Sequence, residues 1–174
     1  DSLEAFLRRV AGWTLAGVAS EKKFGFLYGP PDSSKSTFLD TLASMLGDYA
    51  QAADFTTWIE QAYGGGNRGD LVRLAGARLV TSSEVAKGAK FDEALLKRVT
   101  GGDPITAAAK YESEITFRPT FTLLLAANDA PKLRDDDEGA WARVLRIPFS
   151  HAIPPDRKDP KFRLRLTDPQ DAGP

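Results

Sequence analysis

The sequence predicts an α/β fold in which helices cover a largely parallel sheet. An apolar segment at 24–28 leads through a loop of glycine, proline and serine into a helical pattern at 35–46. Further apolar runs, typical of buried strands, follow along the chain at 78–82, 121–126 and 144–149. Segments with helical spacing alternate with these runs, which is the pattern of a parallel sheet with helices on its faces.

The individual elements follow from local patterns. Leu3, Phe6, Leu7 and Val10 recur at helical spacing, which predicts an amphipathic helix over 3–16. Glycines then mark where helices end, because they tolerate the left-handed backbone of a helix terminus. The shorter expected elements are a capped helix at 54–62, a flexible linker at 63–69, a short helix at 70–74, a helix at 92–100, and a hairpin made by 104–109 and 114–118.

Composition excludes several classes of protein. The chain has 174 residues, of which 42% are hydrophobic and 27% charged, which suits one domain with a sizeable core. It contains no cysteine, so a disulfide framework and a thiolate metal site are excluded. No run approaches the ~18 apolar residues of a membrane span, and the first residues do not resemble a signal peptide, so we expect a cytoplasmic location. With a net charge of −1, binding to nucleic acid would need a local basic patch or an assembly.

The loop at 29–37 carries the strongest chemical signal. It reads GPPDSSKST and resembles the G-x-x-x-x-G-K-[ST] pattern of a phosphate-binding P-loop, between a strand and a helix as that motif requires. Its backbone N–H groups and the helix N-terminus would surround the phosphates of a nucleotide. Lys35 would reach the β- and γ-phosphates, and the Ser36 hydroxyl would hold Mg²⁺. The expected nucleotide-binding residues are Gly29, Pro30, Pro31, Asp32, Ser33, Ser34, Lys35, Ser36 and Thr37.

Ser34 departs from this pattern, because it stands where the motif has its second glycine. Serine prefers a negative φ, so we expect the loop to be slightly strained or reshaped there. The alternative interpretation is a turn that starts an ordinary helix, with Ser33 or Ser34 as its N-cap.

Hydrolysis of a nucleotide needs further groups beside the P-loop. Glu84 follows a predicted buried strand, at the sheet edge where ligands bind, and would polarise the attacking water and support the metal. Asn128 follows another such strand and would hydrogen-bond a phosphate or the lytic water without adding negative charge. Arg143 would stabilise charge in the transition state, as an arginine finger does. Taken alone, Glu84 and Asn128 are equally consistent with a solvated glutamate and a turn-forming asparagine, and Arg143 would be interpreted as a strand-flanking surface arginine.

Five segments, in this order, resemble the helicase domain of the phage and plasmid primase–helicase family, which belongs to the superfamily-three helicases within the AAA+ ATPases. They are GPPDSSKSTF, GARLVTSSE, LLKRVTGGDPITA, FRPTFTLLLAAND and DDDEGAWARVLRIPF, and the resemblance covers about residues 3–165. It implies a three-layer P-loop NTPase sandwich with a largely parallel central sheet, an N-terminal helix and a β-hairpin insertion.

The resemblance also implies catalytic roles. Gly29, Lys35 and Ser36 match the Walker A positions, and Glu84 matches the Walker B glutamate, so Ser36 and Glu84 are the implied metal-binding residues. Asn128 matches the sensor asparagine. Arg143 matches one of a tandem arginine pair that faces the site of a neighbouring subunit.

Two departures from the family pattern stand out. Ala142 replaces the first arginine of the tandem pair, which leaves Arg143 alone. Ala108 and Ala109 stand where the family often has an arginine, in a hairpin that projects into a central channel. Lys110 and Tyr111 remain in that hairpin to contact a phosphate and a base of DNA.

The resemblance implies an ATP-dependent DNA helicase or translocase of DNA replication, with ATP and Mg²⁺ as its cofactors. Its implied partners are single-stranded or forked DNA and further copies of itself, in a ring expected to be a hexamer in the full-length protein, with no membrane. The cell would be bacterial or phage-infected. We expect an N-terminal helical segment at 1–22, a P-loop ATPase core at 23–153, and a tail at 154–174 that is cut before a further domain.

Two alternatives use the same P-loop. A small-molecule or nucleoside kinase should carry an arginine-rich lid, for which the segment 63–70 offers only Arg68. A catalytically impaired module for DNA binding or assembly would explain Ser34 and Ala142 as signs of decay. A measurement of DNA-stimulated ATP hydrolysis distinguishes a helicase from these two alternatives.

Overall fold

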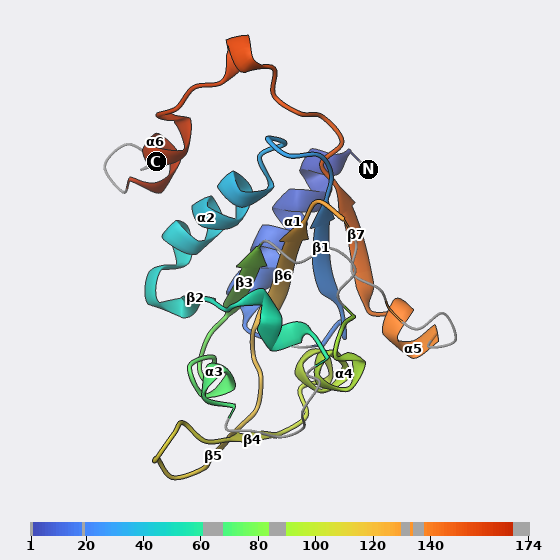
Figure 1. The fold of residues 1–174 in the computed structure, drawn as a ribbon, viewed down its shortest axis with the longest axis vertical. Helices are drawn as coiled ribbons and strands as arrows, with labels where there is room; N and C mark the ends of the chain where they lie inside the picture. The colour runs from blue at the N-terminus through green and yellow to red at the C-terminus, as the bar shows by residue number, and fades with distance from the viewer. Residues whose placement is uncertain are drawn as a thin grey trace.

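The computed structural model describes residues 2–18, 20–60, 68–83, 90–129, 133 and 138–168. Five described strands form one parallel sheet in the order β2-β3-β6-β1-β7, and two further strands form an antiparallel hairpin (Figure 1). The predicted α/β fold with a parallel sheet and a hairpin insertion is therefore confirmed. The sheet strands are β1 Phe24–Tyr28, β2 Ala50–Ala52, β3 Leu79–Ser83, β6 Thr122–Ala127 and β7 Val144–Pro148, and the hairpin strands are β4 Ile105–Ala107 and β5 Ile115–Phe117.

Strand β1 lies between β6 and β7, and its register aligns the carboxyl ends of three strands. Tyr28 at the end of β1 pairs with Ala127 of β6, and Ala126 pairs with Ser83 at the end of β3. Loops that follow parallel strands leave at the same edge of the sheet. The P-loop after β1 and the residues that follow β6 therefore start side by side.

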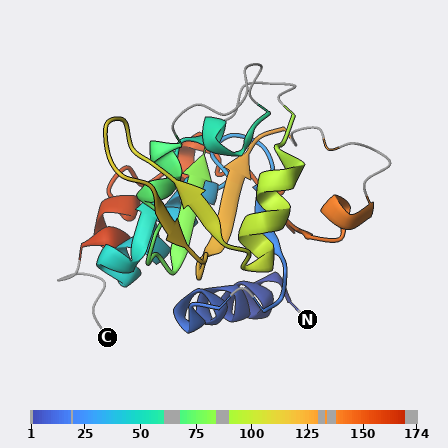
Figure 2. The same ribbon diagram turned by 90° about the horizontal axis from the view of Figure 1, so that it is seen from below.

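Helices cover both faces of the sheet. Helices α1 (Leu3–Ala16) and α2 (Lys35–Leu46) pack on one face, where Leu27, Leu124 and Ile147 are buried. The other face buries Phe26, Leu123 and Leu125 under α3 (Gly69–Val72), α4 (Glu93–Gly101) and the hairpin. Figure 2 shows α1, in blue, along one side of the molecule. Strand residues alternate between the two faces, which gives the three layers that the sequence predicts.

Most predicted elements are confirmed within one or two residues, and one is corrected. The capped helix expected at 54–62 is a 3-10 turn, η2 (Phe55–Trp58), with Asp54 as its N-cap. Trp58 turns into the core, where it is fully buried and donates a hydrogen bond from Nε1 to Ser82 Oγ at 2.8 Å. Ile59 then forms a bridge to Phe91. A continuing helix would give up both contacts, so tertiary packing ends the turn.

The chain after β7 passes over the P-loop and packs against α2. The Phe149 N–H donates to Tyr28 O at 2.8 Å, and the Ile153 N–H donates to Asp32 O at 2.9 Å. After the turn η3 (Pro155–Arg157), helix α6 (Phe162–Thr167) lies beside α2, where Ser44 Oγ donates to Thr167 O at 2.8 Å. The short helix α5 (Glu138–Trp141) precedes β7. Among the described residues, every helix is too short or too polar to cross a membrane.

Gly29, where β1 becomes the P-loop, has a backbone that only glycine tolerates. Its φ is 149°, and a Cβ atom there would lie 2.1 Å from the carbonyl oxygen of Phe149. That oxygen belongs to the backbone next to β7, so it cannot yield without shifting the strand. A side chain at this position would therefore push the P-loop away from the sheet.

We expect Gly29→Ala to lower the free energy of unfolding by about 3 kcal/mol, from the steric overlap and the strained φ together. Chemical denaturation of the two proteins measures it. Gly12→Ala is the matched control, because a Cβ at Gly12 meets nothing within 4 Å. In the helix α1 it should be neutral or stabilising by up to about 1 kcal/mol. Equal effects of the two substitutions would contradict the close contact.

Candidate functional site

A cleft of about 460 Å³ opens at the carboxyl edge of the sheet. The P-loop forms one wall, and the ends of β3 and β6 form the rest. Lys35 and Asn128 line the same cleft, as does Ser83. Glu84, the expected acid, follows Ser83 but lies outside the described residues. The full lining is Pro31, Asp32, Ser33, Ser34, Lys35, Ser36, Thr37, Ser83, Ala126, Ala127, Asn128 and Asp129.

Ser34 adopts the conformation that a glycine would have at this position. Its φ is 67° and its ψ is 16°, in the left-handed region, and it stands immediately before α2. Its side chain makes no capping hydrogen bond to the helix, so the interpretation of Ser34 as an ordinary N-cap is not supported. The loop therefore keeps a turn suited to glycine, and Ser34 carries the strain that the sequence led us to expect.

The ammonium group of Lys35 lies inside the loop. Nζ donates to Gly29 O at 2.9 Å, to Pro30 O at 2.7 Å and to Ser33 Oγ at 3.1 Å. The residue is 7% exposed. Burial lowers the pKa of Lys35 below its ordinary value of 10.5, and the charge of Asp32 acts in the opposite direction. A buried cation at the base of an open cleft is suited to bind an anion.

The segment after β7 adds a contact that the sequence analysis missed. Lys158 Nζ lies 2.6 Å from Asp32 Oδ2, at the tip of the P-loop. A second hollow of about 560 Å³ adjoins the cleft here and shares Asp32, Ser34 and Thr37 with it. Ile153, Pro160 and Phe162 contribute apolar side chains to this hollow, and Arg157 and Arg163 contribute cations. The only sequence signal was the basic pair 157–158 after the last strand.

Gly29 and Pro30 adjoin the cleft through their bonds with Lys35, whereas Arg143, Lys110 and Tyr111 lie away from it. Arg143 precedes β7, at the edge of the sheet opposite to the P-loop, where its carbonyl accepts a hydrogen bond from the Phe24 N–H. Lys110 and Tyr111 lie in the loop of the β4–β5 hairpin. The Tyr111 side chain is 92% exposed, and Lys110 Nζ lies 4.9 Å from the centre of its ring. One chain therefore presents three separate groups of predicted residues.

The cleft provides the kind of donors that Mg²⁺ requires. Ser36, in the first turn of α2, and Asp129, after β6, both line it and carry oxygen ligands. Among the described residues, no three His, Cys, Asp or Glu side chains gather to hold an ion by themselves. Mg²⁺ in nucleotide sites is usually held by one or two protein oxygens together with phosphate oxygens, so the residues present fit that arrangement.

With this geometry in place, comparison with known proteins identifies the family. The family DUF5906, described as a family of unknown function, matches residues 27–143. The chain belongs to this family. The matched range runs from the end of β1, through the P-loop and the hairpin, to Arg143.

The chain is also similar to three viral proteins whose names begin "Putative helicase". L207/L206 of Acanthamoeba polyphaga mimivirus is 30% identical over 149 residues, which cover 85% of this chain and 16% of that protein. V13 of Sputnik virophage is 28% identical, over 88% of this chain and 20% of that protein. 022R of Frog virus 3 is 27% identical, over 86% of this chain and 16% of that protein. The chain thus spans about a sixth to a fifth of the length of these relatives.

Solved structures of the NrS-1 C-terminal region share the fold. One apo form superposes with a TM-score of 0.68 at 12% identity, and the match covers 98% of this chain and 40% of that chain. A second structure of the region gives a TM-score of 0.64 at 12% identity, and the match covers 93% of this chain and 37% of that chain. At this level of identity, the similarity supports the fold alone.

We expect Ser34→Gly to raise the free energy of unfolding by up to about 1 kcal/mol. Glycine removes the left-handed strain, although its greater freedom in the unfolded chain offsets part of the gain. Ser33→Gly is the matched control, because it deletes an acceptor of Lys35 and should be destabilising by about 1 kcal/mol. Chemical denaturation distinguishes them, and two substitutions of the same sign and size would contradict the strain at Ser34.

The affinity for a triphosphate should fall as the pH rises toward 10.5, the ordinary pKa of a lysine. Lys35 loses its proton below the ordinary pKa of a lysine, and a neutral amine attracts phosphate less than an ammonium. Since a bound anion favours the charged amine, binding should be accompanied by proton uptake in this range. Calorimetry with a non-hydrolysable ATP analogue measures both. Lys35→Ala should bind more weakly throughout and lack this decline, and parallel profiles for the two proteins would contradict the assignment.

Proposed function

We propose that this chain is the ATP-hydrolysing domain of a replicative DNA helicase or translocase of the viral and phage type. The observation that carries the proposal is the cleft that joins the buried Lys35 ammonium to Asn128 at the end of the neighbouring strand. The similarity to viral proteins named as helicases supports the choice of reaction. DNA and further copies of this chain are the proposed partners.

The groups of the cleft suit the γ-phosphate end of ATP. Lys35 now donates to carbonyl oxygens of its own loop, and phosphate oxygens would replace these as stronger, charged acceptors. Asn128 would orient the attacking water or contact the γ-phosphate. Ser36 and Glu84 would hold Mg²⁺, whose charge offsets the negative charge that develops on the phosphates. Glu84 would also polarise the water.

The adjoining hollow suits the rest of the nucleotide. It begins at P-loop residues that also line the cleft, and its apolar lining includes the Phe162 ring. A purine ring could pack against such side chains, while Arg157 or Lys158 would lie near the ribose and the phosphates. We therefore propose that the nucleoside occupies the space between the P-loop and the segment after β7.

The position of Arg143 supports catalysis between subunits. Arg143 lies beside Phe24 at the start of β1, and the P-loop follows the other end of this five-residue strand. At about 3.3 Å per residue, the two ends of β1 are about 13 Å apart. This separation favours a contact of Arg143 with a nucleotide bound to a neighbouring copy rather than to its own chain, and we propose a ring with sites between subunits. The hexameric ring remains a proposal.

The hairpin supplies the proposed contact with DNA. Tyr111 at its tip is almost fully exposed with a φ of 68°, and Lys110 lies over its ring. An exposed aromatic face can stack on any base, and a lysine beside it can contact the phosphate. The two strands are joined by a hydrogen bond between the Thr106 and Thr116 hydroxyls at 2.8 Å. A hairpin held in this way can present both groups to one strand of DNA.

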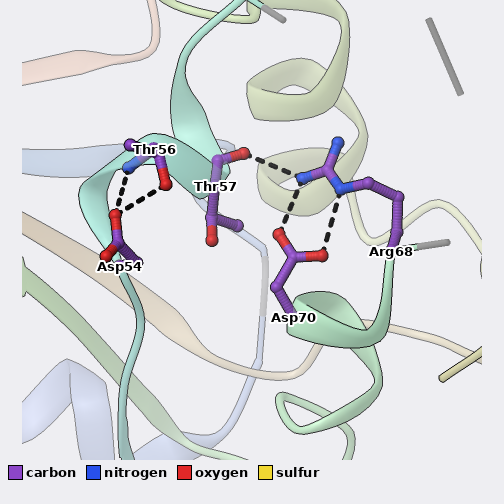
Figure 3. A network of polar contacts seen from close by, with 5 residues as sticks. All are labelled: Asp54, Thr56, Thr57, Arg68 and Asp70. Atoms are coloured by element: carbon purple, nitrogen blue, oxygen red, sulfur yellow. Dashed lines mark hydrogen bonds and ion pairs between the residues drawn. The ribbon is translucent and has the colours of Figure 1, made fainter. Parts of the chain in front are cut away.

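The kinase alternative loses its one lid candidate. Arg68 donates to both carboxylate oxygens of Asp70, each at 3.1 Å, and to Thr57 O at 2.9 Å (Figure 3). These contacts hold Arg68 in a separate hollow that it lines together with Lys110, beside the hairpin. An arginine held there is not available to close over phosphates in the cleft.

Mixing two inactive variants tests the proposed site and its assembly together. Lys35→Ala should abolish ATP hydrolysis without unfolding the chain, and Arg143→Ala should slow hydrolysis but spare nucleotide binding. An equimolar mixture should recover activity, because the Lys35→Ala copies can supply Arg143 to the intact cleft of the other variant. Turnover is measured with single-stranded DNA present.

Arg146→Ala is the control for the arginine, since Arg146 is exposed on the same strand β7 and should leave turnover unchanged. Unchanged turnover of Lys35→Ala would refute the nucleotide site itself. Failure of the mixture to recover, together with a slowed monomer of Arg143→Ala, would place Arg143 in its own site and refute the ring arrangement.

A further inference from the structure

The guanidinium of Arg143 is held by the helix that precedes the hairpin. Its Nη1 donates to Thr100 Oγ1 at 3.0 Å. Thr100 is 5% exposed, and its hydroxyl donates its own proton to Leu96 O at 2.6 Å, one turn back in α4. A hydroxyl has one proton and two lone pairs, so the bond to Leu96 O leaves Oγ1 as an oriented acceptor for Arg143.

The end of α4 that carries Thr100 is also tied to both sides of the hairpin. Arg98 Nη2 donates to Pro104 O at 3.1 Å, just before β4. Arg118 Nη1, just after β5, donates to Gly102 O at 3.1 Å, the residue that ends α4 in a left-handed conformation. The Asp103 N–H closes the turn with a bond to Arg98 O at 3.1 Å. The base of the hairpin and the last turn of α4 therefore form one hydrogen-bonded unit.

We propose that Thr100 is a positioning residue for Arg143, which it couples to the movement of the β4–β5 hairpin. This inference rests on the function proposed above, in which the hairpin contacts DNA and Arg143 contacts a neighbour's nucleotide. A displacement of the hairpin moves the last turn of α4, and Thr100 carries the guanidinium with it. In the opposite direction, a shift of Arg143 toward a γ-phosphate moves Thr100 and the last turn of α4, and with them the base of the hairpin.

The positioning of Arg143 by Thr100 matters more in this chain than it would if a second arginine preceded Arg143. Ala142 contributes no side-chain charge at the position before Arg143, so one guanidinium alone is available. Arg143 has four bonds of free rotation along its side chain, and a fixed acceptor restricts where its charge can lie. The main chain at this point is fixed as well, because the Arg143 N–H donates to Ala140 O at 3.0 Å.

The test compares Thr100→Val with Thr100→Ser in the full chain. Valine keeps the shape of the side chain and removes the acceptor, and serine keeps the acceptor. We expect Thr100→Val to lower the kcat of DNA-stimulated ATP hydrolysis about tenfold, which is the value of one hydrogen bond to a charged group. The KM for ATP should not change, the stimulation by single-stranded DNA should be lost, and Thr100→Ser should retain both.

A double-mutant cycle separates positioning from a merely structural role. If Thr100 acts through Arg143, adding Thr100→Val to Arg143→Ala should cause no further loss of kcat. An equal loss in the presence and absence of Arg143 would overturn the inference, and so would a Thr100→Val enzyme with normal DNA stimulation. Should valine prevent folding, Thr100→Ala removes the same hydroxyl and faces the same criteria. If Arg143→Ala alone keeps full turnover, the proposed function fails before this inference is reached.

Discussion

The candidate site depends on the three hydrogen bonds that the Lys35 ammonium donates inside its own loop. The loop bends through left-handed residues at Asp32 and Ser34. Lys35 donates to the carbonyl oxygens of Gly29 and Pro30, before the bend, and to the Ser33 hydroxyl within it, and so ties these parts of the loop together. The group proposed to bind the phosphates is therefore also the group that shapes the loop. In the proposed binding, phosphate oxygens would replace the acceptors of a Lys35 side chain that is already held in place, so little conformational entropy would be lost.

The parallel sheet separates the P-loop from Arg143. Strand β1 carries the P-loop at its carboxyl end, and Arg143 lies at its amino end, beside Phe24. Strand β1 is flanked by β6 and β7, and the sheet holds the two groups at its opposite ends. This separation is the reason for the proposal that Arg143 acts on a neighbouring copy. The bond from Arg143 to Thr100 connects this arginine to the end of α4, at the base of the hairpin.

Local sequence patterns predicted most elements of the fold. The features that these patterns missed depend on short length or on contacts between residues distant in the sequence. The strand at 24–28, the helix at 35–46 and the hairpin follow from periodicity and glycine placement, and all three are confirmed. Strand β2 has three residues, too few for an alternation to be recognised. The turn at Trp58 ends because its indole reaches Ser82, 24 residues away along the chain.

The same division applies to the site. The motif predicted the place of Lys35 and the strand-end rule that of Asn128, because both depend on residues close in sequence to a strand, and the structure shows that they line one cleft. The contacts of Asp32 with Lys158 and of Arg143 with Thr100 join residues 126 and 43 positions apart. Nothing in the local sequence distinguishes Thr100 from another buried threonine in a helix, so its place beside Arg143 could be found only in three dimensions.

Ser34 and Ala142 both depart from the pattern of the helicases that the sequence resembles, and the two departures have unequal weight. A serine in a left-handed conformation costs about 1 kcal/mol, against a total stability of about 5–15 kcal/mol for a domain, and Ser34 keeps the turn that glycine would make. Its presence is therefore weak evidence for decay of the site. Ala142 removes a charge outright, and no change of backbone can restore it. In the proposed function, the contact with a neighbouring copy would depend on one arginine, and the buried Thr100 hydroxyl would orient it.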